Sequence, residues 1–151
     1  MISLDSAIKH APLLIAGNDP ASLAVFEKAF LDAGYRNIKT TSDLREVRPL
    51  FQRWKFDLVI MDVFMPGLGS FDVMEDLRGP IRDDGLAVIA IVNSEDRIGR
   101  QKLLDQGARD FISKPFDRGE SLGRIKTILE NKILFARHQM MMETGSSAEA
   151  T

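Results

Sequence analysis

The sequence predicts an α/β fold in which a doubly wound, five-stranded parallel sheet is covered by helices on both faces. Short, nearly continuous apolar runs alternate along the chain with longer segments whose apolar residues recur every three or four positions. The runs have the composition of strands buried on both faces, and strict alternation of strand and helix is typical of parallel sheets. The chain has 151 residues, 44% of them hydrophobic, which suits one globular domain.

Five segments are predicted as strands, three of them continuous in Leu, Ile, Val and Ala. In chain order they are PLLIAG (12–17), NIKT (37–40), FDLVIM (56–61), LAVIAIV (86–92) and DFIS (110–113). Ligands of such sheets bind at the carboxyl ends of the strands, near the point where strand order reverses. We therefore expect the functional residues in the loops after the first, third, fourth and fifth strands.

Five segments have helical spacing: residues 21–31, 44–54, 71–77, 97–104 and 122 onward. Asp19 before Pro20 predicts a capped helix start, and Gly34 and Gly107 stand where helices should end. Pro49 lies inside the second segment and should break or kink a helix there. We expect that helix to be split or to start late.

Composition excludes several classes of function. With 20 basic and 22 acidic side chains the net charge is −2, so direct nucleic-acid binding is not expected. The chain has no cysteine, and His10 and His138 stand far apart, which excludes a disulfide framework and a cysteine zinc site. The amino terminus shows no basic leader, and no segment approaches the ~20 apolar residues of a membrane span. We expect a soluble, cytoplasmic protein that does not enter a membrane.

Asp62 follows a strongly apolar strand, in FDLVIMDVFMPGLG. Burial of an ionised acid is costly unless a partner compensates. In the predicted sheet the loops GNDP, DVFMPGLG and KPF converge, so Lys114 can pair with Asp62 and favour its charged form. Such a carboxylate can accept a phosphoryl group, whereas an ordinary surface pair contributes less than about 1 kcal/mol. Position alone leaves both interpretations open.

The motifs LLIAGNDP, DLVIMDVFMPG and GARDFISKPF together resemble the receiver domain of two-component response regulators, over about residues 10–132. Their order and separations support the resemblance, with 45 positions from Gly17 to Asp62 and 52 from Asp62 to Lys114. It implies flavodoxin-like topology, with Asp62 accepting a phosphoryl group from a histidine kinase or phosphotransfer protein, and Lys114 contacting that group.

The resemblance also assigns roles to the neighbouring loops. Pro66 and a cis bond before Pro115 would shape the loops that follow the third and fifth strands. The backbone carbonyl of Phe64 would ligate Mg²⁺ beside Asp62. Receivers of this family are signalling modules, so no enzyme activity is expected.

The first departure from the family follows the first strand, where receivers normally carry two acids and this chain has Gly17 and Asn18. Neutral ligands hold a hard cation poorly, so we expect weak Mg²⁺ binding, or none, and slow phosphorylation. Asp19 could lend a carboxylate, although a role as helix cap is favoured. Asn18 and Asp19 complete the candidate metal ligands with Asp62 and Phe64.

The second departure concerns the family's switch residues. The position of the switch hydroxyl is Val92, which has no donor, and the switch aromatic corresponds to Phe111, which has no phenolic group. Asn93 or Ser94 could contact the phosphoryl group instead, while Ser94 could equally cap the next helix. We expect hydrogen-bonded switching to be lost.

The last helical segment is longer than a receiver requires. We expect residues 120–142 to mediate homodimerisation or partner docking, with 133–151 forming a helical extension and polar tail beyond a receiver domain at 10–132. The alternative is that its first turns pack on the sheet and its Met-rich end frays. The same stretch resembles linkers that lead from receivers into kinases or cyclic-dinucleotide enzymes. A heptad-like stripe supports the dimer, consisting of Leu122, Ile125, Leu129, Ile133, Ala136 and Met140, widened by Ile128 and Phe135.

Two functions therefore remain within the family: a phosphorylated receiver, or a pseudo-receiver that acts by protein binding and dimerisation without phosphorylation. A small hydrolase or phosphatase would need a second acid two residues after Asp62, where Phe64 stands. A nucleotide-binding module is disfavoured because GNDP is not a glycine-rich phosphate cradle.

Overall fold

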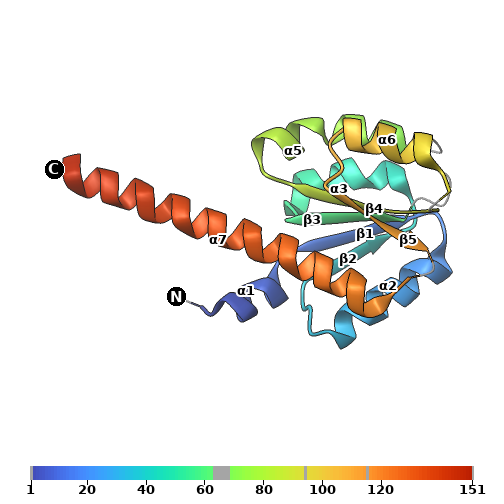
Figure 1. Ribbon diagram of the computed structural model, residues 1–151, viewed down its shortest axis with the longest axis horizontal. Coiled ribbons are helices and arrows are strands. Elements are labelled where there is room, and N and C mark those ends of the chain that lie inside the picture. The colour runs from blue at the N-terminus through green and yellow to red at the C-terminus, as the bar shows by residue number, and fades with distance from the viewer. Residues whose placement is uncertain (1, 63–68, 94, 115, 151) are drawn as a thin grey trace.

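Five parallel strands form one sheet in the order β2-β1-β3-β4-β5 (Figure 1). The computed structural model describes residues 2–62, 69–93, 95–114 and 116–150. The order reverses at β1 and β3, as in doubly wound folds, and confirms the predicted architecture. The strands are β1 (Leu13–Gly17), β2 (Ile38–Thr41), β3 (Leu58–Asp62), β4 (Ala87–Asn93) and β5 (Asp110–Lys114).

Helices cover both faces of the sheet and enclose a core on each side (Figure 1). Alternate residues of β3 point to opposite cores: Val59 and Met61 to one, Leu58 and Ile60 to the other. The first core is covered by α3 (Val47–Trp54), α4 (Ser70–Asp76) and α6 (Arg97–Asp105). The second is covered by α1 (Leu4–His10), α2 (Pro20–Asp32) and α7 (Arg118–Ala150).

The helix start predicted at Asp19 and the helix ends predicted at Gly34 and Gly107 are present in the structure. Asp19 accepts a hydrogen bond from the amide of Ala21 at the start of α2. Gly34 and Gly107 have φ of 98° and 114°, the left-handed conformation in which glycine ends a helix without strain. A 3₁₀ turn, η1 (Leu44–Glu46), precedes α3, so Pro49 lies in the first turn of the α-helix, where its missing N–H costs little. That helix starts late, as expected.

Two short helices were not predicted from the sequence. In α1, the side chain of Ile8 is 1% exposed and belongs to the core under α2 and α7. The second, α5 (Arg78–Asp83), follows α4 directly and places Ile81 against the opposite core. The buried Ile8 extends the packed core to the amino-terminal side of residue 10, while the domain limits at 10 and 132 stay a prediction.

The last helix, α7, packs on the sheet with its first half and projects beyond it with its second (Figure 1). The structure corrects one part of the predicted stripe, because Ile125 and Leu129 are 0% exposed and Ile133 packs against the same core. Ile125 and Leu129 therefore cannot face a partner chain. The large apolar side chains that are exposed on the described part of this helix are Leu134, Phe135, Met140, Met141 and Met142. Among the described residues, no helix has the length and apolar character that crossing a bilayer requires.

Candidate functional site

Asp62 and Lys114 meet at the carboxyl edge of the sheet, at the ends of β3 and β5. Lys114 Nζ lies 2.9 Å from Asp62 Oδ1, and the side chains are 28% and 2% exposed. The ammonium also donates a hydrogen bond of 3.3 Å to Asp62 Oδ2. The predicted pair is therefore present, with a buried acid compensated by a half-buried base.

The two carboxylate oxygens of Asp62 have different environments. Oδ2 accepts the hydrogen bond from Lys114, whereas the buried Oδ1 accepts none within the described parts of the chain, even though the ammonium is nearest to it. The contact at Oδ1 is thus electrostatic, with lone pairs that no described donor satisfies. Since buried polar atoms normally have a hydrogen-bond partner, Oδ1 is an exception among the described side-chain atoms.

Asp19 serves the start of α2, as the favoured interpretation predicted. Its side chain accepts hydrogen bonds from Ser22 Oγ at 3.0 Å and from the amide of Ala21 at 3.1 Å. These bonds hold the pKa of the Asp19 carboxyl below its usual value. The bond from Ser22 has the largest effect and the bond from Ala21 the next, while the charge of Lys114 contributes less. The carboxylate is exposed and engaged in capping, and its role as a metal ligand stays a prediction.

Gly17 is the β1 residue that pairs with Asp62 in the β1–β3 register. Asn18 follows it and is exposed. Within the described residues, no group of three or more acidic or histidine side chains could hold a metal ion. The described side chains at this edge therefore do not fit a Mg²⁺ site by themselves, since they offer one lysine-paired carboxylate and one capping carboxylate.

The predicted switch positions differ in burial. Val92 is 0% exposed and lies in the core beneath α4 and α6. Phe111 is partly buried against the same core, with the guanidinium of Arg100 5.9 Å from its ring centroid. Asn93 ends β4 opposite Lys114 in the sheet register, but its side chain lies outside the described part of the structure. Four further predicted residues lie outside the described residues altogether: Phe64, Pro66, Ser94 and Pro115.

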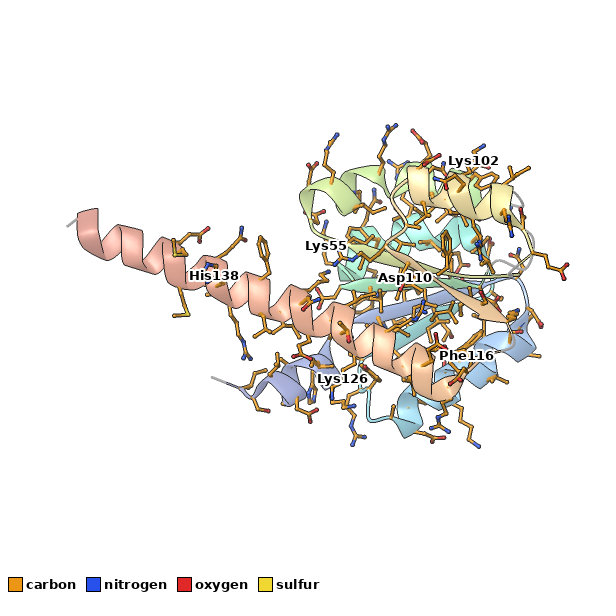
Figure 2. The ribbon with its side chains drawn as sticks, viewed as in Figure 1. Lys55, Lys102, Asp110, Phe116, Lys126 and His138 are labelled. Carbon is orange, nitrogen blue, oxygen red and sulfur yellow. The ribbon has the colours of Figure 1, made fainter. Side chains whose placement is uncertain are left out.

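Sequence reasoning missed a cleft beside Lys114. It has a volume of about 310 Å³ and is lined by Ala21, Ser22, Val25, Phe26, Lys114 and Phe116. The rings of Phe26 and Phe116 meet edge to face at 4.7 Å, and Figure 2 shows Phe116 at the foot of α7, beside α2. The side chain of Val25 is 61% exposed. The sequence signal that could have indicated this cleft was Val25, an apolar residue on the outer face of α2.

Comparison with known proteins agrees with this geometry. Residues 13–126 match the family described as the response regulator receiver domain. A probable transcriptional regulator, ycf27 of Guillardia theta, is 31% identical over 140 residues, covering 91% of this chain and 53% of that protein. The chain thus spans about half the length of this curated relative.

Solved structures share the fold. Chemotaxis protein CheY4 of Vibrio cholerae superposes with a TM-score of 0.69 at 23% identity, covering 79% of this chain and 98% of that one. The receiver domain of sensor histidine kinase PA1611 from Pseudomonas aeruginosa PAO1, solved with magnesium in its active-site cleft, gives 0.69 at 22% identity, covering 80% and 98%. The five-stranded sheet, the paired Asp62 and Lys114 at its carboxyl edge and the match over residues 13–126 agree, and the chain belongs to the response regulator receiver domain family.

Proposed function

We propose that this chain receives a phosphoryl group on Asp62 in two-component signal transduction, from a histidine kinase or a phosphotransfer protein. The observation that carries the proposal is the buried Asp62 carboxylate, held by Lys114 at 2.9 Å at the carboxyl edge of β3. Family membership of residues 13–126 supports it. Asp carboxylates can form aspartyl phosphates, so the Asp62 carboxylate has the chemistry that the proposal requires.

The transfer can be written with the residues described. A carboxylate oxygen of Asp62 attacks phosphorus, the bond from phosphorus to the donor's imidazole nitrogen breaks, and that nitrogen keeps the electron pair. Asp62 then carries an acyl phosphate. Because the Asp62 side chain is only 2% exposed, the groups that cover it have to move before phosphorus can reach the carboxylate. After transfer, the same ammonium can donate to the phosphoryl oxygens.

The cleft beside Lys114 suits a protein donor. Its apolar wall from α2 and Phe116 lies next to the ammonium, so a donor could bury an apolar side chain while its phosphohistidine faces Asp62. We place the chain in the cytoplasm, where such donors act. We propose no direct nucleic-acid contact, given the net charge of −2, and no enzymatic output from these residues.

A pseudo-receiver that signals by protein binding alone is the second candidate. Neutral Gly17 and Asn18 favour it, together with Val92 at the switch position. We propose that Mg²⁺ binding is weak in either case, because the described carboxylates are engaged by Lys114 and by the start of α2.

We also propose that the chain forms a homodimer through α7. Leu134, Phe135, Met141 and Met142 occupy neighbouring positions at spacings of seven residues, on the part of the helix that projects beyond the sheet. Figure 2 shows His138 on this projecting part. A second copy of the helix would cover these side chains about a two-fold axis.

Phosphorylation is tested with acetyl phosphate and with a phosphorylated phosphotransfer protein, each followed by intact mass measurement. We expect the mass of one phosphoryl group on the natural chain and none on Asp62→Asn. Asp84→Asn, at an exposed position before β4, is the control and should keep the label. A label that persists on Asp62→Asn would refute the assignment, and no label from either donor would favour the pseudo-receiver.

A further inference from the structure

Gly17 lies unusually close to the phosphoacceptor candidate. A Cβ atom built at position 17 would lie 2.9 Å from Asp62 Cβ and 3.0 Å from the backbone oxygen of Asp62. Carbon atoms that do not share a bond pack at about 3.5 to 4.0 Å. Neither Asp62 atom is the end of a flexible side chain, so a side chain at position 17 would push β1 and β3 apart.

Position 17 requires glycine because a side chain has no space there, and not because the backbone adopts a conformation that only glycine can reach. Gly17 is absent from the glycines with positive φ, so its backbone conformation is open to other residues. Gly123, in α7, differs, because a Cβ there would meet nothing within 4 Å. Among the described glycines, Gly17 is therefore the one at which Asp62 occupies the space of a side chain.

We infer that Gly17 is a positioning residue for Asp62, and that position 17 cannot carry a metal-binding acid while β1 and β3 keep this spacing. The close approach of the strands sets the position of the Asp62 carboxylate relative to Lys114, which lies 2.9 Å from Oδ1. An acid at position 17 would displace the carboxylate it is meant to assist. The neighbouring Asn18 is exposed, and an acid there meets no such obstacle.

This inference deepens the proposed function, and its last step, on the metal, rests on that function. The packing step does not, because it concerns two backbone segments whether or not Asp62 accepts a phosphoryl group. The experiment therefore measures stability and the state of the Asp62 carboxyl first, and metal affinity second.

The packing step is tested by introducing Gly17→Ala into three backgrounds: the natural chain, Asp62→Ala and Asp62→Gly. Asp62→Ala keeps the Cβ that the new methyl group would meet, and Asp62→Gly removes it. In urea unfolding, we expect Gly17→Ala to lower the folding equilibrium constant by about five- to one-hundredfold in the first two backgrounds. In the Asp62→Gly background this loss should be smaller by at least about threefold, since the shortest contact, with Asp62 Cβ, is gone.

Gly123→Ala is the matched control and should leave the chain at least as stable as the natural one. If Gly17→Ala in the natural chain fails to fold, Asp62→Gly should restore folding to the double variant. Equal losses in all three backgrounds, or a Gly17→Ala variant as stable as Gly123→Ala, would overturn the inference.

The positioning step needs a readout that a merely structural role would not change. The carbon NMR chemical shift of the Asp62 carboxyl is compared at one neutral pH, in the natural chain and in Gly17→Ala. We expect Gly17→Ala to change the Asp62 signal while those of Asp43 and Asp83, which pair with Arg45 and Arg82, stay unchanged. An unchanged Asp62 signal would show that Gly17 does not set its position.

The metal step compares Mg²⁺ titrations of Asn18→Asp and Gly17→Asp by calorimetry. We expect Asn18→Asp to tighten Mg²⁺ binding by about tenfold and Gly17→Asp to leave it unchanged or weaker. Tighter binding in Gly17→Asp would refute the exclusion of an acid there. If Asp62→Asn still takes up phosphoryl groups while the coupling between positions 17 and 62 stands, the proposed function fails and the packing inference survives.

Discussion

Lys132 Nζ donates a hydrogen bond of 2.6 Å to the backbone carbonyl oxygen of Asp57, at the amino end of β3. The same ammonium lies 3.7 Å from Asp57 Oδ1, and the lysine side chain is 23% exposed. The carbonyl of Asp57 also accepts the amide of Ala87, at 3.3 Å, at the start of β4. Lys132 thus ties α7 to the edge of the sheet opposite Asp62.

The burial of Lys132 predicts a pH-dependent contribution to stability. Burial lowers the Lys132 pKa from 10.5, because the charged ammonium loses hydration, and the charge of Asp57 opposes the shift only in part. The folded chain then binds this proton less tightly than the unfolded chain does. The free energy of unfolding should therefore rise as the pH increases from the lowered pKa toward 10.5.

The measurement is urea unfolding over this alkaline range, taken as the difference between the natural chain and Lys132→Met. Burial raises the pKa of Tyr35, which acts in the opposite direction, and the difference cancels it. We expect the relative stability of the natural chain to increase with pH. Lys126→Met, at an exposed position of α7, is the control for replacing a lysine by methionine, and a flat difference for Lys132→Met would contradict the prediction.

Removal of the Ile8 side chain should show that α1 belongs to the folded core. Ile8 is 1% exposed, so Ile8→Ala should cost about 2 to 5 kcal/mol in the free energy of unfolding. Ile2→Ala, at a position 61% exposed, is the control and should change little. Similar unfolding midpoints for both variants would support a domain that begins at residue 10.

The pair of Lys114 and Asp62 should be energetically coupled. Lys114→Met leaves the Asp62 carboxylate buried without its cation, which should cost about 1 to 3 kcal/mol. Added to Asp62→Asn, the same substitution should cost less, because the uncompensated charge is gone. Unfolding of the two single variants and the double variant measures the coupling, with Lys28→Met as the control at an exposed position. Strictly additive effects would argue against the pair.

The projecting face of α7 should control the oligomeric state. The double substitution of Phe135 and Met142 to serine, or truncation after Arg137, should convert a dimer into a folded monomer in sedimentation. Each buried side chain of this kind contributes about 1.5 to 3 kcal/mol to association. Truncation at that point keeps the bond from Arg137 to the carbonyl of Ile2 and the bonds of Lys132.

Val25→Ser provides the control for the dimer, since this apolar side chain is 61% exposed but lies on α2. Sedimentation with and without acetyl phosphate completes the test. Equal masses for the natural chain, the truncated chain and the double serine variant would exclude α7, and a dimer seen only with acetyl phosphate would show that switching survives with Val92.

The sheet could be predicted from the sequence because its signals are local. β1, β3 and β4 are apolar except for Asp62 and Asn93 at the ends of β3 and β4, and each strand lies within two residues of its predicted limits. The Asp62–Lys114 pair followed from the topology, since the carboxyl ends of parallel strands share one edge. Motif and fold together were sufficient for that part of the site.

The errors arose where tertiary contacts decide the outcome. In α5, Gly79 and Pro80 disfavour a helix locally, yet the segment is helical with Ile81 against the core. The stripe through Ile125 and Leu129 has the spacing of a dimer seam, and its period does not tell a partner helix from the sheet beneath. The crowding at Gly17 depends on the distance between two strands, which a sequence pattern does not contain.

Because α7 is anchored at Lys132, a small tilt of the helix moves its projecting end by a larger distance. Met142 lies ten residues beyond Lys132, about 15 Å along the helix axis at 1.5 Å per residue. A tilt of the α7 axis by about 10° about Lys132 would displace Met142 by about 2.5 Å. Small rotations at the amino edge of β3 are therefore amplified along the arm into displacements the size of a methyl group.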